Sequence, residues 1–243
     1  DQLENNLDTY YNMNDATGDA IDQKDYDNNG TLTNISTITG LYNNAYEFNG
    51  SSSYISMDSD PIQQGQDTNF TVSVWVYIDA NPASGGYIYD SKVNDLWLSI
   101  NSSGQPGFRF YDSSTVVEQR GDALNLNEWN HVVFMYDNGT SLKIYQNSLN
   151  TLNYNTTKNP RNMSNPHASI GSNRGASGGW FDGYLDEIAF WDGAIAKNDI
   201  NELYNQRAGL TYGEGLETYD VNFSIIYSGA GDNNIQYFST DNS

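Results

Sequence analysis

Short apolar stretches with a period of two residues dominate this sequence and limit what the chain can fold into. In the clearest of them, Phe70–Ile78, Val72, Val74 and Val76 fall on one face and Trp75 on the other. Successive side chains of a β-strand point to opposite faces, so this alternation indicates a strand. Because both faces carry bulky apolar side chains, we expect the strand to be covered on both sides.

Similar stretches recur between clusters of Gly, Asn, Asp and Ser, the residues that form turns. They are Tyr10–Met13, Ala45–Phe48, Tyr54–Met57, Gly86–Tyr89, Leu96–Ile100, Gly107–Tyr111, His131–Tyr136, Leu142–Tyr145, Ala168–Gly171 and Tyr184–Trp191. A helical pattern is seen in Lys197–Gln206. Many short strands and scarcely any helix predict an all-β fold, an antiparallel jelly-roll β-sandwich with one short helix near its C-terminal end.

The apolar content is sufficient for one sizeable core. Hydrophobic residues make up 37% of the 243 and aromatic residues 14%, and sandwiches of about 200–250 residues commonly form a single domain. We therefore predict a jelly-roll domain over residues 1–209. The pattern changes after Gly209, so residues 210–243 are expected to form a tail, a linker or an added β-hairpin.

The charge excludes two classes of partner. The chain has 10 Lys and Arg against 31 Asp and Glu, a net charge of −21. Nucleic acids and anionic membrane surfaces are bound by clustered Lys and Arg, so neither is expected as a partner. No apolar run approaches the roughly 20 residues of a membrane span, which argues against membrane insertion.

The densest acidic segment runs from Asp15 to Gly30 and carries five Asp and two Asn residues. Calcium takes six to eight oxygen ligands from carboxylates, amides, carbonyls and water, and such a segment can supply them. The spacing does not fit an EF-hand. Two interpretations stay open, a calcium site and a solvated acidic loop.

Sugar recognition combines aromatic rings with Asn, Asp and Arg on loops above a rigid sheet. The segment Ser172–Asp182 has this composition. The candidate binding residues there are Asn173, Arg174, Trp180 and Asp182, and two further candidates elsewhere are Trp97 and Tyr111. The alternative is that Trp180 only covers an edge of the sandwich.

Five segments, in chain order, resemble the laminin-G-like jelly-roll modules of the concanavalin A-like lectin/glucanase superfamily. They are Tyr11–Leu32 (YNMNDATGDAIDQKDYDNNGTL), Ala45–Ile55 (AYEFNGSSSYI), Phe70–Val76 (FTVSVWV), Asn127–Tyr136 (NEWNHVVFMY) and Phe181–Trp191 (FDGYLDEIAFW). The resemblance covers residues 1–209 and gives no account of residues 210–243. It implies a Ca²⁺ site between the first loop and the closing strand. Carried over by position, its ligands are Asp15, Asp22, Asn28, Gly30 and Asp186.

The sequence gives little support for catalysis. Hydrolases of the resembled superfamily carry Glu-x-Asp-x-x-Glu on one strand, and that motif is absent. Asp186 and Glu187 are adjacent in an expected strand and should point to opposite faces. His131 is expected to serve packing, and His167 lies in a loop without an evident partner. We expect no catalytic residues and no enzyme.

These observations favour a non-catalytic, calcium-stabilised carbohydrate-binding or adhesion module, displayed outside the cell and bound to a glycan or a cell-surface polysaccharide. The alternative is a structural subunit, decoration or fibre domain of a virion or cell-surface appendage, working through other protein subunits. A second alternative is a remnant or accessory domain of a glycoside hydrolase. A structural subunit should expose a large apolar patch, whereas a lectin should have an aromatic-lined concavity.

Overall fold

The computed structural model describes residues 2–24, 27–62, 69–91, 95–113, 115–161, 168–173 and 175–205. Contacts within the chain divide it into two units, Asp1–Thr211 and Tyr212–Ser243, and the second contains no described residue. The tail, linker or hairpin expected in residues 210–243 therefore lies outside the described residues.

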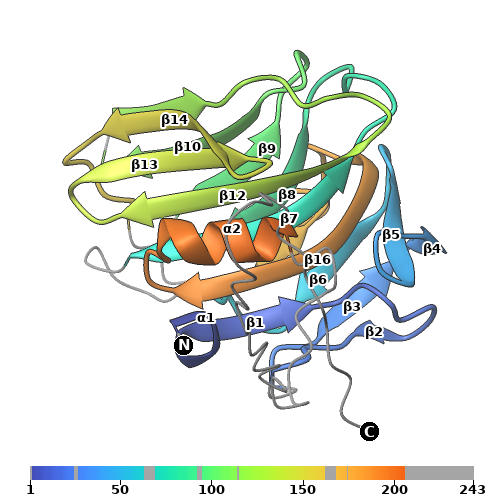
Figure 1. Ribbon diagram of the computed structural model, residues 1–243. Helices are drawn as coiled ribbons and strands as arrows, with labels where there is room; N and C mark the ends of the chain where they lie inside the picture. Colours follow the sequence, from blue (N-terminus) through green and yellow to red (C-terminus); the bar gives the residue numbers. More distant parts are fainter. Residues whose placement is uncertain are drawn as a thin grey trace, which may run out of the picture. The chain divides into compact units, whose positions relative to one another are not determined.

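Two antiparallel sheets form the domain (Figure 1). In spatial order the first holds β14 (Leu149–Asn155), β13 (Ser141–Gln146), β12 (Trp129–Asp137), β7 (Phe70–Tyr77), β16 (Asp182–Asp192), β5 (Asn44–Asn49) and β4 (Ser36–Thr39), with β1 (Leu7–Tyr11) also paired to β16. The second holds β11 (Thr115–Arg120), β10 (Pro106–Asp112), β9 (Leu96–Ile100), β8 (Gly86–Ser91), β15 (Ala168–Ile170), β6 (Tyr54–Met57), β3 (Gly30–Thr33) and β2 (Asp19–Ala20). The helices are α1 (Gln2–Asn5) and α2 (Lys197–Asn205). The expected jelly-roll β-sandwich is confirmed.

The main core lies between the sheets and is built by the inward side chains of alternating strands. Val72, Val74 and Val76 of β7 belong to it together with Phe108 and Phe110 of β10, all fully buried. Removing this much apolar surface from water is the dominant favourable contribution to folding. The alternation read from the sequence therefore places the right side chains in the core.

A second cluster covers the outer face of the first sheet. Helix α2 lies across that face (Figure 1) and contributes Ile200 and Leu203, which pack with Trp191 of β16. Trp75 stacks on Tyr204 of the same helix, with ring centroids 5.9 Å apart. The helix therefore covers the second apolar face of β7, as the sequence pattern of that strand requires.

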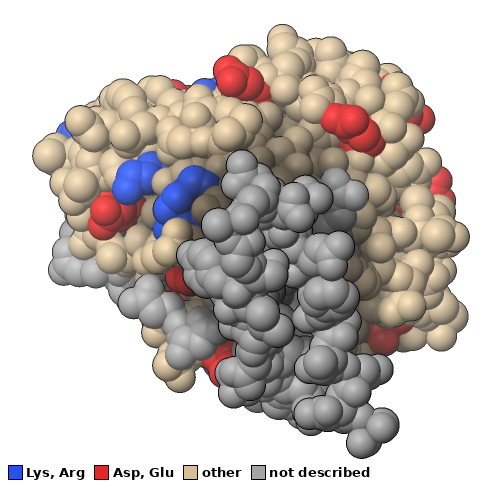
Figure 2. Space-filling view, in the orientation of Figure 1, with Lys and Arg blue, Asp and Glu red and all other residues tan. Residues whose placement is uncertain are grey.

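The acidic side chains on one face of the domain are dispersed (Figure 2). On the face shown in Figure 2, Asp and Glu lie apart from one another instead of forming one patch. Over the described part of the chain, no helix combines the length and the apolar character that crossing a bilayer demands.

Candidate functional site

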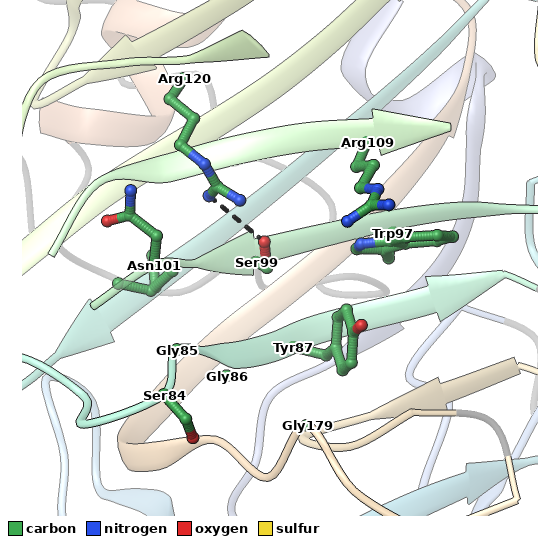
Figure 3. A pocket seen from close by; sticks show the side chains of 11 residues that line it. Ser84, Gly85, Gly86, Tyr87, Trp97, Ser99, Asn101, Arg109, Arg120 and Gly179 are labelled. Carbon is green, nitrogen blue, oxygen red and sulfur yellow. Dashed lines mark hydrogen bonds between the residues drawn. The ribbon is translucent and has the colours of Figure 1, made fainter. Parts of the chain in front are cut away.

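A pocket opens on the outer face of the second sheet, where β8, β9, β10 and β11 are adjacent. Leu96, Leu98 and Ile100 are fully buried in the core, so the alternation of β9 turns Trp97 and Ser99 outward. The pocket has a volume of about 190 Å³. It is lined by Ser84, Gly85, Gly86, Tyr87, Trp97, Ser99, Ile100, Asn101, Arg109, Arg120 and Gly179 (Figure 3).

Three side chains from three adjacent strands form one wall. Trp97 is the register partner of Arg109 on β10, whose guanidinium carbon lies 5.0 Å from the centroid of the indole ring. Tyr87 on β8 meets the indole edge-on, with ring centroids 6.0 Å apart and an interplanar angle of 89°. Figure 3 shows Arg109 over Trp97, with Tyr87 projecting from the next strand. Partly exposed aromatic surface thus lies beside a cation.

Arg120 of β11 is held in place by several acceptors. Its Nε and Nη2 donate to Glu118 Oε1 at 3.2 and 2.8 Å. Its Nη1 donates to Ser99 Oγ at 3.4 Å (Figure 3). Nη1 also donates to the carbonyl oxygen of Gln105 at 3.3 Å. These contacts fix the guanidinium above the pocket but use most of its donors.

Arg109 is bound differently. Its Nη1 lies 3.7 Å from Glu118 Oε2, beyond hydrogen-bond range. Its Nε is buried and has no hydrogen-bond partner among the described residues. The stack on Trp97 orients this guanidinium and leaves its donors available.

Glycines bring a loop close to β8 at one end of the pocket. The amide of Tyr87 donates to the carbonyl of Gly179 at 2.9 Å. A Cβ at Gly179 would lie 2.0 Å from carbons of the Tyr87 ring, and one at Gly86 would lie 2.6 Å from Phe181 Cα. Neither position has space for a side chain, so both glycines shape the pocket.

The structure separates the residues predicted to bind sugar. Trp97 lines the pocket. Tyr111 contacts Trp97, with ring centroids 5.9 Å apart, without lining the pocket. Asn173 Oδ1 instead accepts the amides of Ser177 and Gly178 at 2.8 and 3.1 Å, which stabilises its own loop.

The remaining predicted sugar ligands lie elsewhere. Trp180 packs on Tyr54, with ring centroids 6.0 Å apart. Asp182 begins β16 opposite Asn49. Neither lines the pocket, and Arg174 and His167 lie outside the described residues.

Sequence reasoning missed most of the pocket. It did not single out Tyr87, Ser99, Asn101 or Arg120. The alternation of the strands could have placed Tyr87 and Ser99 on an outer face. No local signal shows that β11 brings Arg120 opposite Gly107 of β10.

Two of the predicted calcium ligands lie against β1. Asp22 is fully buried, and its Oδ1 accepts the amides of Tyr10 and Lys24 at 3.0 and 3.1 Å. Asn28 donates through Nδ2 to Thr9 Oγ1 at 3.1 Å. The backbone carbonyl of Asn28 accepts a hydrogen bond from the hydroxyl of Tyr11. Hydrogen bonds to β1 therefore hold both side chains in position.

An acidic environment surrounds this part of β1. Burial raises the pKa of Asp8 to about 6, and Lys24 partly opposes this shift. Asp192, Asp27 and Asp22 raise the pKa of Asp8 further. Negative charge is thus concentrated where the first loop meets the strand.

The other predicted ligands are engaged separately. Asp186 is fully buried, and its Oδ2 accepts the amide of Leu41 at 2.9 Å, whereas Oδ1 has no hydrogen-bond partner in the described structure. Burial raises the pKa of Asp186 to about 7. Asp15 Oδ2 accepts the amide of Ile21 at 3.2 Å. A Cβ at Gly30 would lie 2.5 Å from Ile55 Cγ2, so packing already accounts for a glycine there.

The pair Asp186 and Glu187 does not follow simple strand alternation. The register of β16 against β7 shifts between Asp186 and Ala189, and Glu187 has a φ of 53°. This β-bulge re-aims the side chains. The hydroxyl of Tyr10 donates to Glu187 Oε2, while Asp186 faces the turn at Leu41. The two carboxylates therefore have separate partners.

Comparison with known structures gives the fold. Domain 4 of AbnA, an extracellular GH43 arabinanase from Geobacillus stearothermophilus solved with arabinotriose, is 20% identical with a TM-score of 0.62, over 82% of this chain and 98% of that one. The receptor-binding domain of the botulinum neurotoxin C/D mosaic serotype is 15% identical with a TM-score of 0.67, over 83% and 51%. The binding domain of Paraclostridial Mosquitocidal Protein 1 is 14% identical with a TM-score of 0.63, over 84% and 53%. The chain spans about half the length of these two toxin domains.

Sequence comparison gives the family. No curated protein matches the chain. The family model for the concanavalin A-like lectin/glucanases superfamily matches residues 49–201, which is more than half of the sequence. Together with the two-sheet jelly roll, this match shows that the chain belongs to the concanavalin A-like lectin/glucanase superfamily, in its laminin-G-like branch.

Proposed function

We propose that this domain is a non-catalytic carbohydrate-binding module of a secreted or surface-displayed protein. The observation that carries the proposal is the pocket in which Trp97 and Tyr87 stand beside Arg109, Arg120 and Asn101. Sugars present apolar C–H faces that pack on aromatic rings and hydroxyl groups that need hydrogen-bond partners, and ligand pockets combine these two kinds of surface. The arabinanase domain of the same fold was solved with arabinotriose.

The lining of the pocket supports a binding role over glycoside hydrolysis. Hydrolysis of a glycosidic bond commonly needs two carboxyl groups that flank it. No Asp or Glu lines the pocket as described. Glu118, the neighbouring carboxylate, is paired with Arg120 at 2.8 Å. A hydrolase remnant or accessory domain with a binding function stays compatible with this arrangement.

A purely structural role has less support. A subunit that works through protein contacts should expose a large apolar patch. Over the described ranges, the exposed large hydrophobic side chains are Val116, Leu126, Leu149 and Tyr154. They are spread over β11, a loop and the edge strand β14, whereas the pocket is lined by aromatic rings.

We also propose that calcium stabilises the fold through the first loop. Asp22 and Asn28 are buried oxygen-bearing side chains beside the same strand, and this is the chemistry that calcium takes. No group of three Asp, Glu or His side chains converges within the described ranges. The other oxygens of a calcium shell would therefore come from amides, backbone carbonyls and water.

Titration with oligosaccharides tests the sugar-binding proposal. Wild-type protein, Trp97→Ala and Trp180→Ala are titrated by NMR with neutral and acidic mono- and oligosaccharides, arabinotriose included. We expect Trp97→Ala to weaken binding by about two- to tenfold, because an aromatic contact contributes about 0.5–1.5 kcal/mol. Trp180→Ala tests the other predicted aromatic ligand, which lies outside the pocket; if the pocket is the site, this variant binds as wild type. Absence of binding to every sugar, or a loss confined to Trp180→Ala, would contradict the proposal.

A further inference from the structure

The three arginines in the described part of the chain differ in how their donors are used. Arg120 is bound to Glu118, Ser99 and Gln105. Arg161 donates from Nε to Asp95 Oδ2 at 2.8 Å. Arg109 has no hydrogen-bonded acceptor among the described residues, and its ion pair with Glu118 is long, at 3.7 Å.

Arg109 is nonetheless fixed in position. Its guanidinium stacks on Trp97 at 5.0 Å, and its side chain is 36% exposed and lines the pocket. Its Nε is buried and unpartnered, and leaving a buried donor unsatisfied costs free energy. A planar guanidinium with open donors is suited to a two-point contact with a carboxylate. A ligand carboxylate would bind the exposed part of this guanidinium, since Nε itself is buried.

The local charge also favours an anion. Arg109 and Arg120 both line the pocket, and Glu118 is shared between them, with Oε1 2.8 Å from Arg120 Nη2 and Oε2 3.7 Å from Arg109 Nη1. The lining residues themselves include no Asp or Glu. Asp90, the register partner of Trp97 on β8, is buried and lies outside the lining. The pocket is therefore cationic in a protein whose net charge is −21.

We propose that the pocket takes a single acidic sugar residue whose carboxylate is bound by Arg109 while its ring packs against Trp97 and Tyr87. This proposal rests on the sugar-binding function above and names the class of sugar. A volume of about 190 Å³ is below the roughly 300–1,000 Å³ typical of pockets for larger ligands, which fits one residue. Charges are screened over about 8 Å at physiological salt. The carboxylate of a single bound sugar is therefore attracted by Arg109 and Arg120, while more distant acidic side chains repel it little. A long polyanion also meets the dispersed acidic surface, so a terminal acidic residue is favoured.

Matched pairs of sugars provide the test. Methyl glucoside and methyl glucuronide differ only at C6, and the galactose and mannose pairs are built in the same way. We expect at least one glucuronide-type ligand to bind about tenfold or more tightly than its neutral partner, since charge-assisted hydrogen bonds are about twice as strong as neutral ones. Polygalacturonate should bind no more tightly per residue than methyl galacturonide.

Three variants locate the effect. Arg109→Gln should abolish the preference for the acidic sugar, because it weakens binding of the acidic member of each pair more than binding of the neutral one. Lys143→Gln removes one positive charge from β13 of the other sheet and should behave as wild type. Glu118→Gln releases Arg120 and should strengthen binding of the acidic sugar.

Failure of this inference is distinct from failure of the sugar-binding function. If neutral sugars bind but no acidic partner binds more tightly, or if the preference survives in Arg109→Gln, the acidic-sugar proposal is overturned and sugar binding stands. If no member of any pair binds, and the wider panel also gives no response, both proposals fail together.

Discussion

The guanidinium of Arg109 lies over the indole of Trp97, 5.0 Å from the ring centroid, because β9 and β10 place the two residues directly opposite each other. Arg161 makes a similar contact with Tyr111 at 4.9 Å. There the guanidinium is also ion-paired to Asp95. The same contact between a guanidinium and an aromatic ring therefore stabilises the fold at Arg161, which is ion-paired. At Arg109 it orients a guanidinium that has no hydrogen-bonded acceptor among the described residues.

Removing Arg161 should destabilise the fold strongly. The Asp95 side chain is only 3% exposed, so Arg161→Ala leaves a buried carboxylate without that cation, a change that costs about 3–5 kcal/mol. The matched control is Lys158→Ala, which breaks an ion pair with Asp112 at 2.9 Å in which the lysine side chain is 49% exposed. An exposed pair contributes about 0.2–1 kcal/mol. Urea unfolding of both variants measures the difference, and equal losses would show that Asp95 is effectively solvated.

Two glycines of one loop should respond differently to alanine. Gly179 and Gly175 both have positive φ, 63° and 91°, so each alanine carries backbone strain of about 1 kcal/mol. A Cβ at Gly179 also meets the Tyr87 ring at 2.0 Å, whereas nothing lies within 4 Å of one at Gly175. We expect Gly179→Ala to cost a further 1–3 kcal/mol or so and to weaken sugar binding by displacing Tyr87.

Gly175→Ala is the control for the backbone strain. It should lose about 1 kcal/mol of stability and bind sugar as wild type. Denaturant unfolding and NMR titration of both variants give the comparison. Identical behaviour of the two variants would show that the contact between Gly179 and Tyr87 does not shape the pocket.

The central strands were predictable because burial determines their sequence. Each of β6 and β9 was expected with the bounds that the structure shows, Tyr54–Met57 and Leu96–Ile100. Their inward side chains are apolar and their turns are rich in Gly, Asn and Ser. Where a strand must fill a core between two sheets, its alternation is visible in the sequence.

The edge strands were not predictable in this way. The sheets end in β14 and β4 and in β11 and β2, and none of these four strands is predicted by the pattern of apolar residues. Most side chains of β14 are exposed, so Leu149–Asn155 shows no apolar alternation. Such strands are held by backbone hydrogen bonds to a neighbour, which leave little trace in side-chain type.

The pocket was predictable only in part, for a related reason. Trp97 could be found from composition, but its neighbours come from the register of separate strands. Composition can also suggest a ligand where a side chain has a local role. Asn173 accepts the amide of Ser177 and closes its own turn, and the sequence does not distinguish such an Asn from a sugar ligand. The binding roles of Asn173, Arg174, Trp180 and Asp182 stay predictions.

Calcium should raise the thermal stability of the fold. A ligand that binds only the native state stabilises it by about 2.7 kcal/mol at 100 times its Kd, so millimolar calcium should raise the Tm and EDTA should lower it. Asp22→Asn keeps the acceptor oxygen for the Tyr10 amide but removes the charge, and it should abolish the response. Asp19→Asn alters an exposed Asp of β2, in the same acidic segment, and should respond as wild type. A calcium response retained in Asp22→Asn, or absent from wild type, would contradict the site.

The last prediction concerns His131 of β12, which is buried beside Trp75 of β7 and stacks on Tyr204 of helix α2. Its Nε2 lies 2.7 Å from Ser73 Oγ, and its ring packs on Trp75 with centroids 5.0 Å apart. Burial, with a smaller effect of Lys197, lowers the pKa of His131 to about 3. The unfolded chain has a His pKa of about 6.5. Between pH 6.5 and pH 3 the unfolded state therefore binds the extra proton.

The stability contribution of this histidine is consequently complete above pH 6.5 and is lost as the pH falls toward 3, at up to about 1.4 kcal/mol per pH unit. His131→Gln loses the ring contact with Trp75, so it should be less stable than wild type at pH 7.5. Because glutamine takes up no proton, the difference in stability should narrow steadily toward pH 4. Asp8 and Asp186, whose pKa values are raised to about 6 and about 7, act in the opposite direction. They titrate in both proteins and cancel in the difference. Urea unfolding at pH 7.5, 6, 5 and 4 gives the two curves, and parallel curves would show that His131 is not kept neutral by burial.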